Sequence, residues 1–150
     1  MAIFKQACTW EVTDKLLVVK ENKCKCVFSN PNQHLLTKIK VDGCQITDGI
    51  RCDYLILDHC HNEYFVELKG KDLPHAVEQL EASIQQLSAP TIQLKKRLLL
   101  YQAVIPPMTL RYKELKLCSR KIWSRAYTKN IQIEINNQII SRQIRLPFFA

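Results

Sequence analysis

Two carboxylates and a lysine are the residues in this sequence whose types and spacing best suit chemistry. Asp53 precedes a run of apolar residues, and Glu67-Leu68-Lys69 ends the next one. Glu67 and Lys69 are two residues apart, so in a strand their side chains point to the same face. Two adjacent carboxylates repel unless a cation neutralises them, and carboxylate oxygens with water suit Mg²⁺ or Mn²⁺. Lys69 could orient or deprotonate a water, or stabilise negative charge developing on a phosphate.

A β-hairpin must bring the two carboxylates together. Residues 58–62 are a short polar connection between two strand candidates, which is a hairpin signal. If Asp58 pairs with Asn62, Asp53 lies directly opposite Glu67, with their Cβ atoms about 4.5–5.5 Å apart on one face. A slip of one residue would turn Asp53 away from Glu67. The two strands are expected over Ile50–Leu57 and Glu63–Lys69.

The remaining pattern predicts one domain over residues 1–150. A helix is expected from an N-cap at Asp72 to about Ser88, with apolar residues at helical spacing. Residues 10–20 are ambiguous between a helix and a strand that starts at Leu16. The fold class is α/β or α+β, a mixed central sheet flanked by helices with a C-terminal hairpin. The other expected elements are a strand over Leu35–Val41, a strand over Arg97–Ile105, a helix over Thr109–Arg125, and a hairpin of Ile131–Ile135 with Gln138–Ile144.

The arrangement of strand, hairpin, strand, glycine, helix and returning strand resembles the PD-(D/E)XK nuclease superfamily, which has the restriction-endonuclease-like fold. Asp53 matches the first acidic position, Glu67-Leu68-Lys69 matches the E-x-K, and Gly49 matches a glycine often found before the aspartate. The likeness covers roughly residues 35–105. Cys52 stands where the family name has proline, a departure that many members share.

The resemblance implies hydrolysis of nucleic-acid phosphodiester bonds with Mg²⁺, for which Mn²⁺ can substitute. It implies that Asp53 and Glu67 are metal ligands, that Lys69 is the catalytic lysine, and that Gln79 is a supporting polar residue of the site. Family members often add a carboxylate from an N-terminal helix, and Glu11 and Glu21 are the candidates here. The expected activity is a DNA endonuclease of the restriction, homing or phage-defence type. Cutting both strands needs two sites, so a homodimer or larger symmetric oligomer is expected.

The charge distribution supports a polyanionic partner. The chain carries 22 basic and 14 acidic residues, a formal net charge of +8, and the whole excess lies in residues 76–150. Basic residues with interleaved tyrosines and Trp123 favour contact with nucleic-acid phosphates. The alternative is a solvated helix face. The residues expected to bind nucleic acid are Arg111, Lys113, Lys116, Arg120, Lys121 and Arg125.

Seven cysteines, an odd number, occur without a signal-peptide pattern at the start. We therefore expect no disulfide framework, mostly reduced thiols with several buried, and a cytoplasmic protein. No apolar run reaches the roughly 20 residues of a membrane-spanning helix. Structural zinc is a weaker interpretation, because no Cys-x₂-Cys pair occurs. The apolar residues 146–149 suit either a dimer contact or the protein's own core.

Three other functions remain open from sequence. The same fold could act on RNA or on branched DNA, or it could bind nucleic acid without catalysis. The basic segment could instead attach the protein to a membrane surface. An exposed salt-bridge cluster is the structural alternative for Asp53, Glu67 and Lys69.

Overall fold

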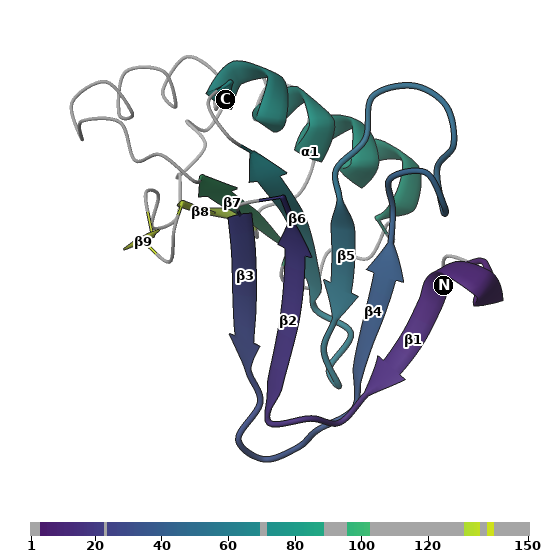
Figure 1. The fold of residues 1–150 in the computed structure, drawn as a ribbon, viewed down its shortest axis with the longest axis vertical. Helices are drawn as coiled ribbons and strands as arrows, with labels where there is room; N and C mark the ends of the chain where they lie inside the picture. Colours follow the sequence, from purple (N-terminus) through teal and green to yellow (C-terminus); the bar gives the residue numbers. More distant parts are fainter. Residues whose placement is uncertain are drawn as a thin grey trace, which may run out of the picture.

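The computed structural model describes residues 4–22, 24–69, 72–88, 96–102, 131–135 and 138–139. Within these residues one α-helix accompanies nine strands (Figure 1). Seven strands form a mixed sheet in the order β1-β4-β5-β6-β7-β8-β9, and β2 and β3 form a separate two-stranded ribbon. The elements are η1 (Gln6–Cys8), β1 (Thr9–Val12), β2 (Leu16–Glu21), β3 (Cys24–Ser29), β4 (Leu36–Lys40), β5 (Tyr54–Leu57), β6 (Glu63–Lys69), α1 (Leu73–Leu87), β7 (Lys96–Gln102), β8 (Ile131–Ile135) and β9 (Gln138–Ile139).

The predicted mixed sheet with a helix is confirmed. Strands β1, β4, β5 and β6 are successive antiparallel neighbours. Helix α1 then connects β6 to β7, which pairs with β6 in parallel. The chain therefore follows the predicted order of hairpin, helix and returning strand, and β8 with β9 forms the predicted terminal hairpin.

Local sequence signals account for the best-defined elements. Strand β6 spans the predicted residues, and α1 begins after Asp72, whose carboxylate accepts a hydrogen bond from the His75 N–H (3.1 Å). The apolar stripe of α1 is buried, with Ala76 and Leu80 almost inaccessible to solvent. These caps and stripes act over a few residues, which is why sequence alone predicts them.

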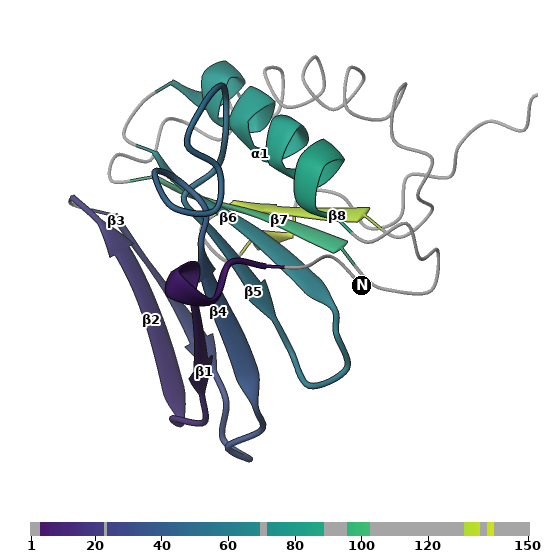
Figure 2. The same cartoon turned by 90° about the vertical axis from the view of Figure 1, so that its right-hand side faces the viewer.

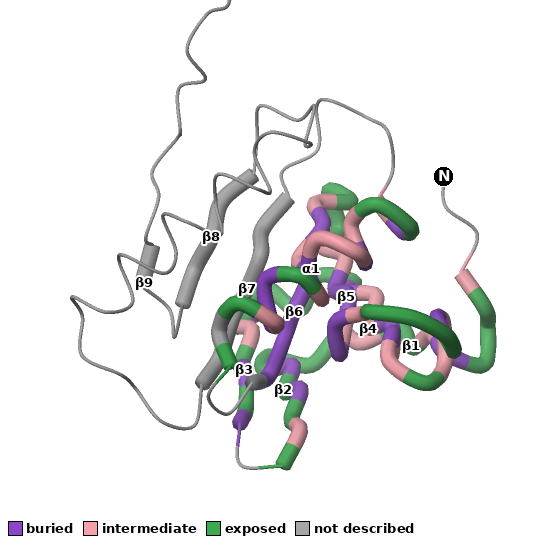
Figure 3. Tube along the Cα trace, turned by 90° about the horizontal axis from the view of Figure 1, so that it is seen from above, coloured by how far each residue is buried: buried purple, intermediate pink, exposed green. Residues whose placement is uncertain are grey.

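Two hydrophobic clusters lie against the main sheet. One joins α1 to residues of β4 and β5 and to Phe65 of β6. The other joins the β2–β3 ribbon to Ile56, Val66 and Leu68. Figure 2 shows α1 and the ribbon as separate layers beside the sheet, and Figure 3 shows that β6 is largely buried. Strand β6 is therefore covered on both faces.

Two strand predictions change in the structure. The ambiguous segment is resolved as strands β1 and β2, with no α-helix there. Strand β5 begins at Tyr54 and not at Ile50, because side chains of α1 bind the main chain of Arg51 and Cys52. The predicted helix over residues 109–125 and the apolar residues 146–149 lie outside the described residues.

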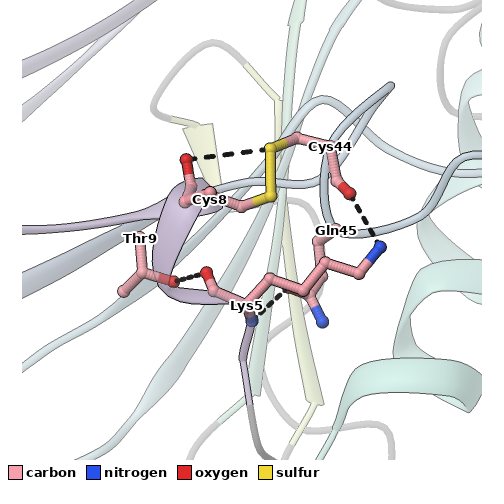
Figure 4. Close-up of a disulfide and its surroundings, with 6 residues drawn as sticks. Lys5, Cys8, Thr9, Cys44 and Gln45 are labelled. Carbon is pink, nitrogen blue, oxygen red and sulfur yellow. Dashed lines mark hydrogen bonds between the residues drawn. A yellow bond between two sulfur atoms is a disulfide. The ribbon is translucent and has the colours of Figure 1, made fainter.

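The expectation that the cysteines stay reduced is wrong for one pair. Cys8 and Cys44 form a disulfide, with Cα atoms 5.7 Å apart (Figure 4). They meet because β1 pairs with β4, so Thr9 lies opposite Ile39, and the turn after β4 brings Cys44 back toward Cys8. The Lys5 Nζ donates a hydrogen bond to the Cys44 carbonyl (3.1 Å) and adds to this connection. Among the described residues, Cys24, Cys26 and Cys52 are buried, as predicted, and Cys60 is free and exposed.

Candidate active site

The predicted hairpin register is confirmed along β5 and β6. Tyr54 lies opposite Val66 and Leu57 lies opposite Glu63. The turn closes as predicted, because the Asp58 N–H donates to the Asn62 carbonyl (3.2 Å). The correct pairing in the turn therefore sets the position of every residue along the two strands.

The regular pairing ends where Asp53 begins. Its N–H donates to the Val66 carbonyl (3.1 Å), and its Oδ2 accepts a hydrogen bond from the Leu68 N–H (2.7 Å). These two bonds reach the residues on either side of Glu67 and hold Asp53 against the main chain of β6. Strand N–H groups lie near the plane of the sheet, so the Asp53 carboxylate turns toward the main chain of β6. The prediction that both carboxylates stand upright on one face is thus corrected at Asp53.

Glu67 belongs to the side of the sheet that α1 covers. Side chains alternate along β6, and Phe65 packs in the cluster against α1. Ser88, at the end of α1, donates a hydrogen bond to the Glu63 carboxylate on the same side. Glu67 comes two residues after Phe65, so its side chain lies on this same side of the sheet, and it is 2% exposed.

The Cys52 thiol lies close to both carboxylates. Complete burial, together with the negative charges of Glu67 and Asp53, raises its pKa to about 12. A thiol that stays protonated is no nucleophile at neutral pH. Cys52 therefore serves as a buried core residue in the cluster against α1.

Helix α1 fixes the chain that leads into Asp53. The Ser83 Oγ accepts a hydrogen bond from the Cys52 N–H (2.7 Å), and the Gln79 Nε2 donates to the Arg51 carbonyl (2.9 Å). Gln79, predicted as a supporting polar residue, thus holds the backbone next to the site. Both bonds satisfy main-chain groups that leave the sheet at this point.

The electrostatics of Asp53 oppose its ionisation. Burial raises the pKa of its carboxyl above the usual value, and the negative charges of Glu21 and Asp42 add to the increase. The Leu68 N–H and the Lys40 ammonium lower this pKa, but they do not outweigh burial. A carboxylate in this position gains from a nearby cation.

The raised pKa predicts how stability depends on Asp53 and pH. The folded protein binds this proton more tightly than the unfolded chain, so the ionised carboxylate lowers stability at neutral pH, and protonation relieves that cost as pH falls. Asp53→Asn keeps an oxygen for the Leu68 N–H without the charge. We expect its melting temperature to exceed that of the wild type near pH 7, and the difference to shrink toward about pH 4. Thermal unfolding of both proteins across this range measures it.

Asp58 is the matched control, because its pKa shifts the other way. Burial raises the pKa of Asp58, but hydrogen bonds from Asn62, Tyr64 and Cys60 outweigh it, so the net shift is downward. Its ionised form stabilises the fold at neutral pH and loses that effect in acid. Asp58→Asn should therefore lower the melting temperature near pH 7. If Asp53→Asn melts at a lower temperature than the wild type at neutral pH, the raised pKa of Asp53 in the folded protein is contradicted.

The other predicted site residues are not all brought together. Glu11 is exposed on β1 opposite Thr37, which pairs with Leu57. Leu57 is four residues from Asp53, about 13 Å along a strand. The prediction that Glu11 binds the metal is thus corrected, because β1 places it at the far end of the sheet. Glu21 is the nearer acid, since its charge acts on Asp53.

Two sets of predicted site residues have side chains that the structure does not describe. Lys69 ends β6, where its backbone pairs with Gln102 of β7, but its side chain is not among those described. The basic residues from Arg111 to Arg125 lie outside the described residues.

No group of three or more histidine, cysteine, aspartate or glutamate side chains in the described part of the chain could hold a metal ion. Mg²⁺ usually keeps several waters and binds one or two carboxylates together with substrate phosphates.

Sequence analysis missed Lys40 and Ser83. Lys40 lies opposite Tyr54, the residue after Asp53, and its charge acts on Asp53. The alternation of Lys38 and Lys40 in a strand beside β5 was a usable signal. Ser83 carried none, because a serine inside an amphipathic helix resembles any other polar helix residue.

Comparisons with known proteins add no further assignment. Scans of protein-family models, of curated proteins and of solved structures each found no match to this chain. The geometry of the site therefore carries the functional argument.

Proposed function

We propose that the protein is a metal-dependent endonuclease that hydrolyses DNA phosphodiester bonds and has a restriction-endonuclease-like core. The observation that supports the proposal is the burial of two acids, Asp53 (7% exposed) and Glu67 (2% exposed), near the end of the β5–β6 hairpin. Burying acidic side chains is costly unless a cation compensates their charge. The hairpin, helix and parallel strand around them are the elements that the sequence resemblance implies.

Each residue has a distinct part in this proposal. Asp53 and Glu67 would hold Mg²⁺, which lowers the pKa of bound water and stabilises charge on the phosphate. Lys69 would orient the attacking water or neutralise the phosphate. Gln79 and Ser83 would position Asp53 by binding the main chain just before it. The basic residues from Arg111 to Arg125 would supply affinity for DNA, and a symmetric dimer would cut both strands.

A membrane role gains no support from the fold. Within the described residues, no helix is both long enough and apolar enough to cross a membrane. This proposal assigns the basic segment to nucleic acid.

The first test is a panel of substrates incubated with the wild-type protein. Supercoiled plasmid, linear duplex, branched DNA, single-stranded DNA and RNA are each incubated with Mg²⁺ or with a chelator. We expect cleavage of at least one DNA substrate with Mg²⁺ and none with the chelator. Cleavage of RNA alone would move the proposal to an RNA nuclease. Binding without cleavage of any substrate would overturn it in favour of a binding module.

A further inference from the structure

An exposed aromatic side chain lies on the same face of the sheet as two lysines. Trp10 of β1 is 46% exposed, although large aromatic residues are mostly buried. It lies opposite Lys38 of β4, whose Nζ is 5.2 Å from the centre of the Trp10 ring. Two residues along β4, the Lys40 Nζ lies 4.5 Å from the centre of the Tyr54 ring on β5. Lysine and aromatic residues thus alternate across three neighbouring strands.

The two lysines differ in their partners. The Lys40 Nζ also forms an ion pair with the Glu21 carboxylate of β2, at 3.3 Å from its Oε2. Burial alone would lower the pKa of Lys40, but Tyr54, Glu21 and Asp53 outweigh it and the net shift is upward. Lys40 therefore stays charged and ties the ribbon to the site. Lys38 is half-buried, and its only ion-pair or ring partner recorded among the described residues is Trp10.

We propose that Trp10 and Lys38 bind an unpaired nucleotide of a single-stranded nucleic acid. An exposed indole offers a stacking surface for a base, and a lysine beside it offers a contact for the phosphate. A base stacks on an aromatic side chain only when it is free of its own duplex stack. The partner is therefore a single strand, or a strand with an unpaired segment.

The surface extends along β4 toward Asp53. Lys38 and Lys40 are two residues apart, about 7 Å along β4, and Lys40 pairs with the residue that follows Asp53. A strand seated on Trp10 would extend past Lys40 toward Asp53. This part of the inference rests on the proposed function, and it makes substrates with unpaired bases the preferred ones.

Binding is tested without metal, so that cleavage plays no part. Fluorescence anisotropy with labelled oligothymidylate, oligouridylate and a duplex is measured in chelator for the wild type, Trp10→Ala, Trp10→Phe and Lys38→Ala. We expect Trp10→Ala to weaken single-strand binding about 5- to 150-fold, the range for losing one base–aromatic stack. Trp10→Phe should retain part of the affinity, and duplex binding should be unchanged. Comparing the affinities for oligothymidylate and oligouridylate shows whether the protein distinguishes DNA from RNA.

Leu35→Ala is the matched control, because Leu35 is also 46% exposed. It should bind both oligonucleotides like the wild type. Quenching of tryptophan fluorescence by unlabelled oligothymidylate should be smaller in Trp10→Phe, in which Trp123 is the remaining tryptophan.

The outcomes separate this inference from the proposed function. Equal single-strand affinity of Trp10→Ala and the wild type, or no single-strand binding by the wild type, overturns the inference. If Trp10→Ala cleaves and binds like the wild type, the protein is a nuclease that does not use this surface. Loss of binding in Trp10→Ala, when no substrate is cleaved by the wild type, leaves the surface and overturns the nuclease.

Discussion

Replacing Glu67 by glutamine should lower metal-dependent cleavage by roughly 10²- to 10³-fold, the scale on which loss of one electrostatic partner of a transition state slows an enzyme. The amide keeps the shape of a side chain that is 2% exposed, but it removes the negative charge that would hold Mg²⁺ in the proposed mechanism. Asp53→Asn should have a similar effect for the same reason. Initial rates on the best substrate of the panel, measured over a range of Mg²⁺ concentrations, give the loss.

The two carboxylate variants combine an expected loss of activity with intact folding. Asp53→Asn should melt no lower than the wild type, so a folding defect cannot account for its inactivity. Asp48→Asn is the control for removal of one acidic charge, because Asp48 is exposed in the loop before Arg51. It should cleave like the wild type. Full cleavage by Glu67→Gln would remove Glu67 from the mechanism.

Loss of the disulfide should produce the largest change in stability. The double variant Cys8→Ser, Cys44→Ser should be less stable by about 2–4 kcal/mol, because the cross-link restricts the unfolded chain over a separation of 36 residues. This corresponds to a fall in melting temperature of roughly 10 °C for a chain of this size. Calorimetry of the oxidised wild type and of the double variant measures the difference.

Reduction provides an independent measurement of the same bond. A dithiol reductant should lower the melting temperature of the wild type to that of the double variant and leave the variant unchanged. Cys60→Ser is the matched control, since Cys60 is free and exposed, and it should melt like the wild type. If the wild type melts at the same temperature with and without reductant, the protein in solution does not contain the bond.

Sequence patterns predicted the hairpin that carries the site because its signals are local. The polar connection after Asp58, the alternation along β6 and the cap at Asp72 each act within a few residues. Together they predict the register of β5 and β6, which the structure confirms from Tyr54 to Leu57. The role of Gln79 was expected in general terms, and the structure specifies its partner as the Arg51 carbonyl.

The failures of the sequence analysis arise from contacts between distant segments. The pairing of β1 with β4 brought Cys8 to Cys44 and moved Glu11 away from the site. The orientation of the Asp53 carboxylate depends on the Leu68 N–H, which a regular strand pattern would assign to the backbone of a neighbour. Neither the β1–β4 pairing nor the hydrogen bond from Leu68 to Asp53 leaves a recognisable pattern within a short stretch of the sequence.

The Cys8–Cys44 bond also closes the chain into a covalent ring. The ring includes β1, the β2–β3 ribbon and β4, together with the exposed turn that contains Pro31 and Asn32. A single proteolytic cut anywhere in this ring opens it but releases no fragment. The N-terminal segment with Trp10 therefore stays attached to the rest of the molecule until the sulfurs are reduced.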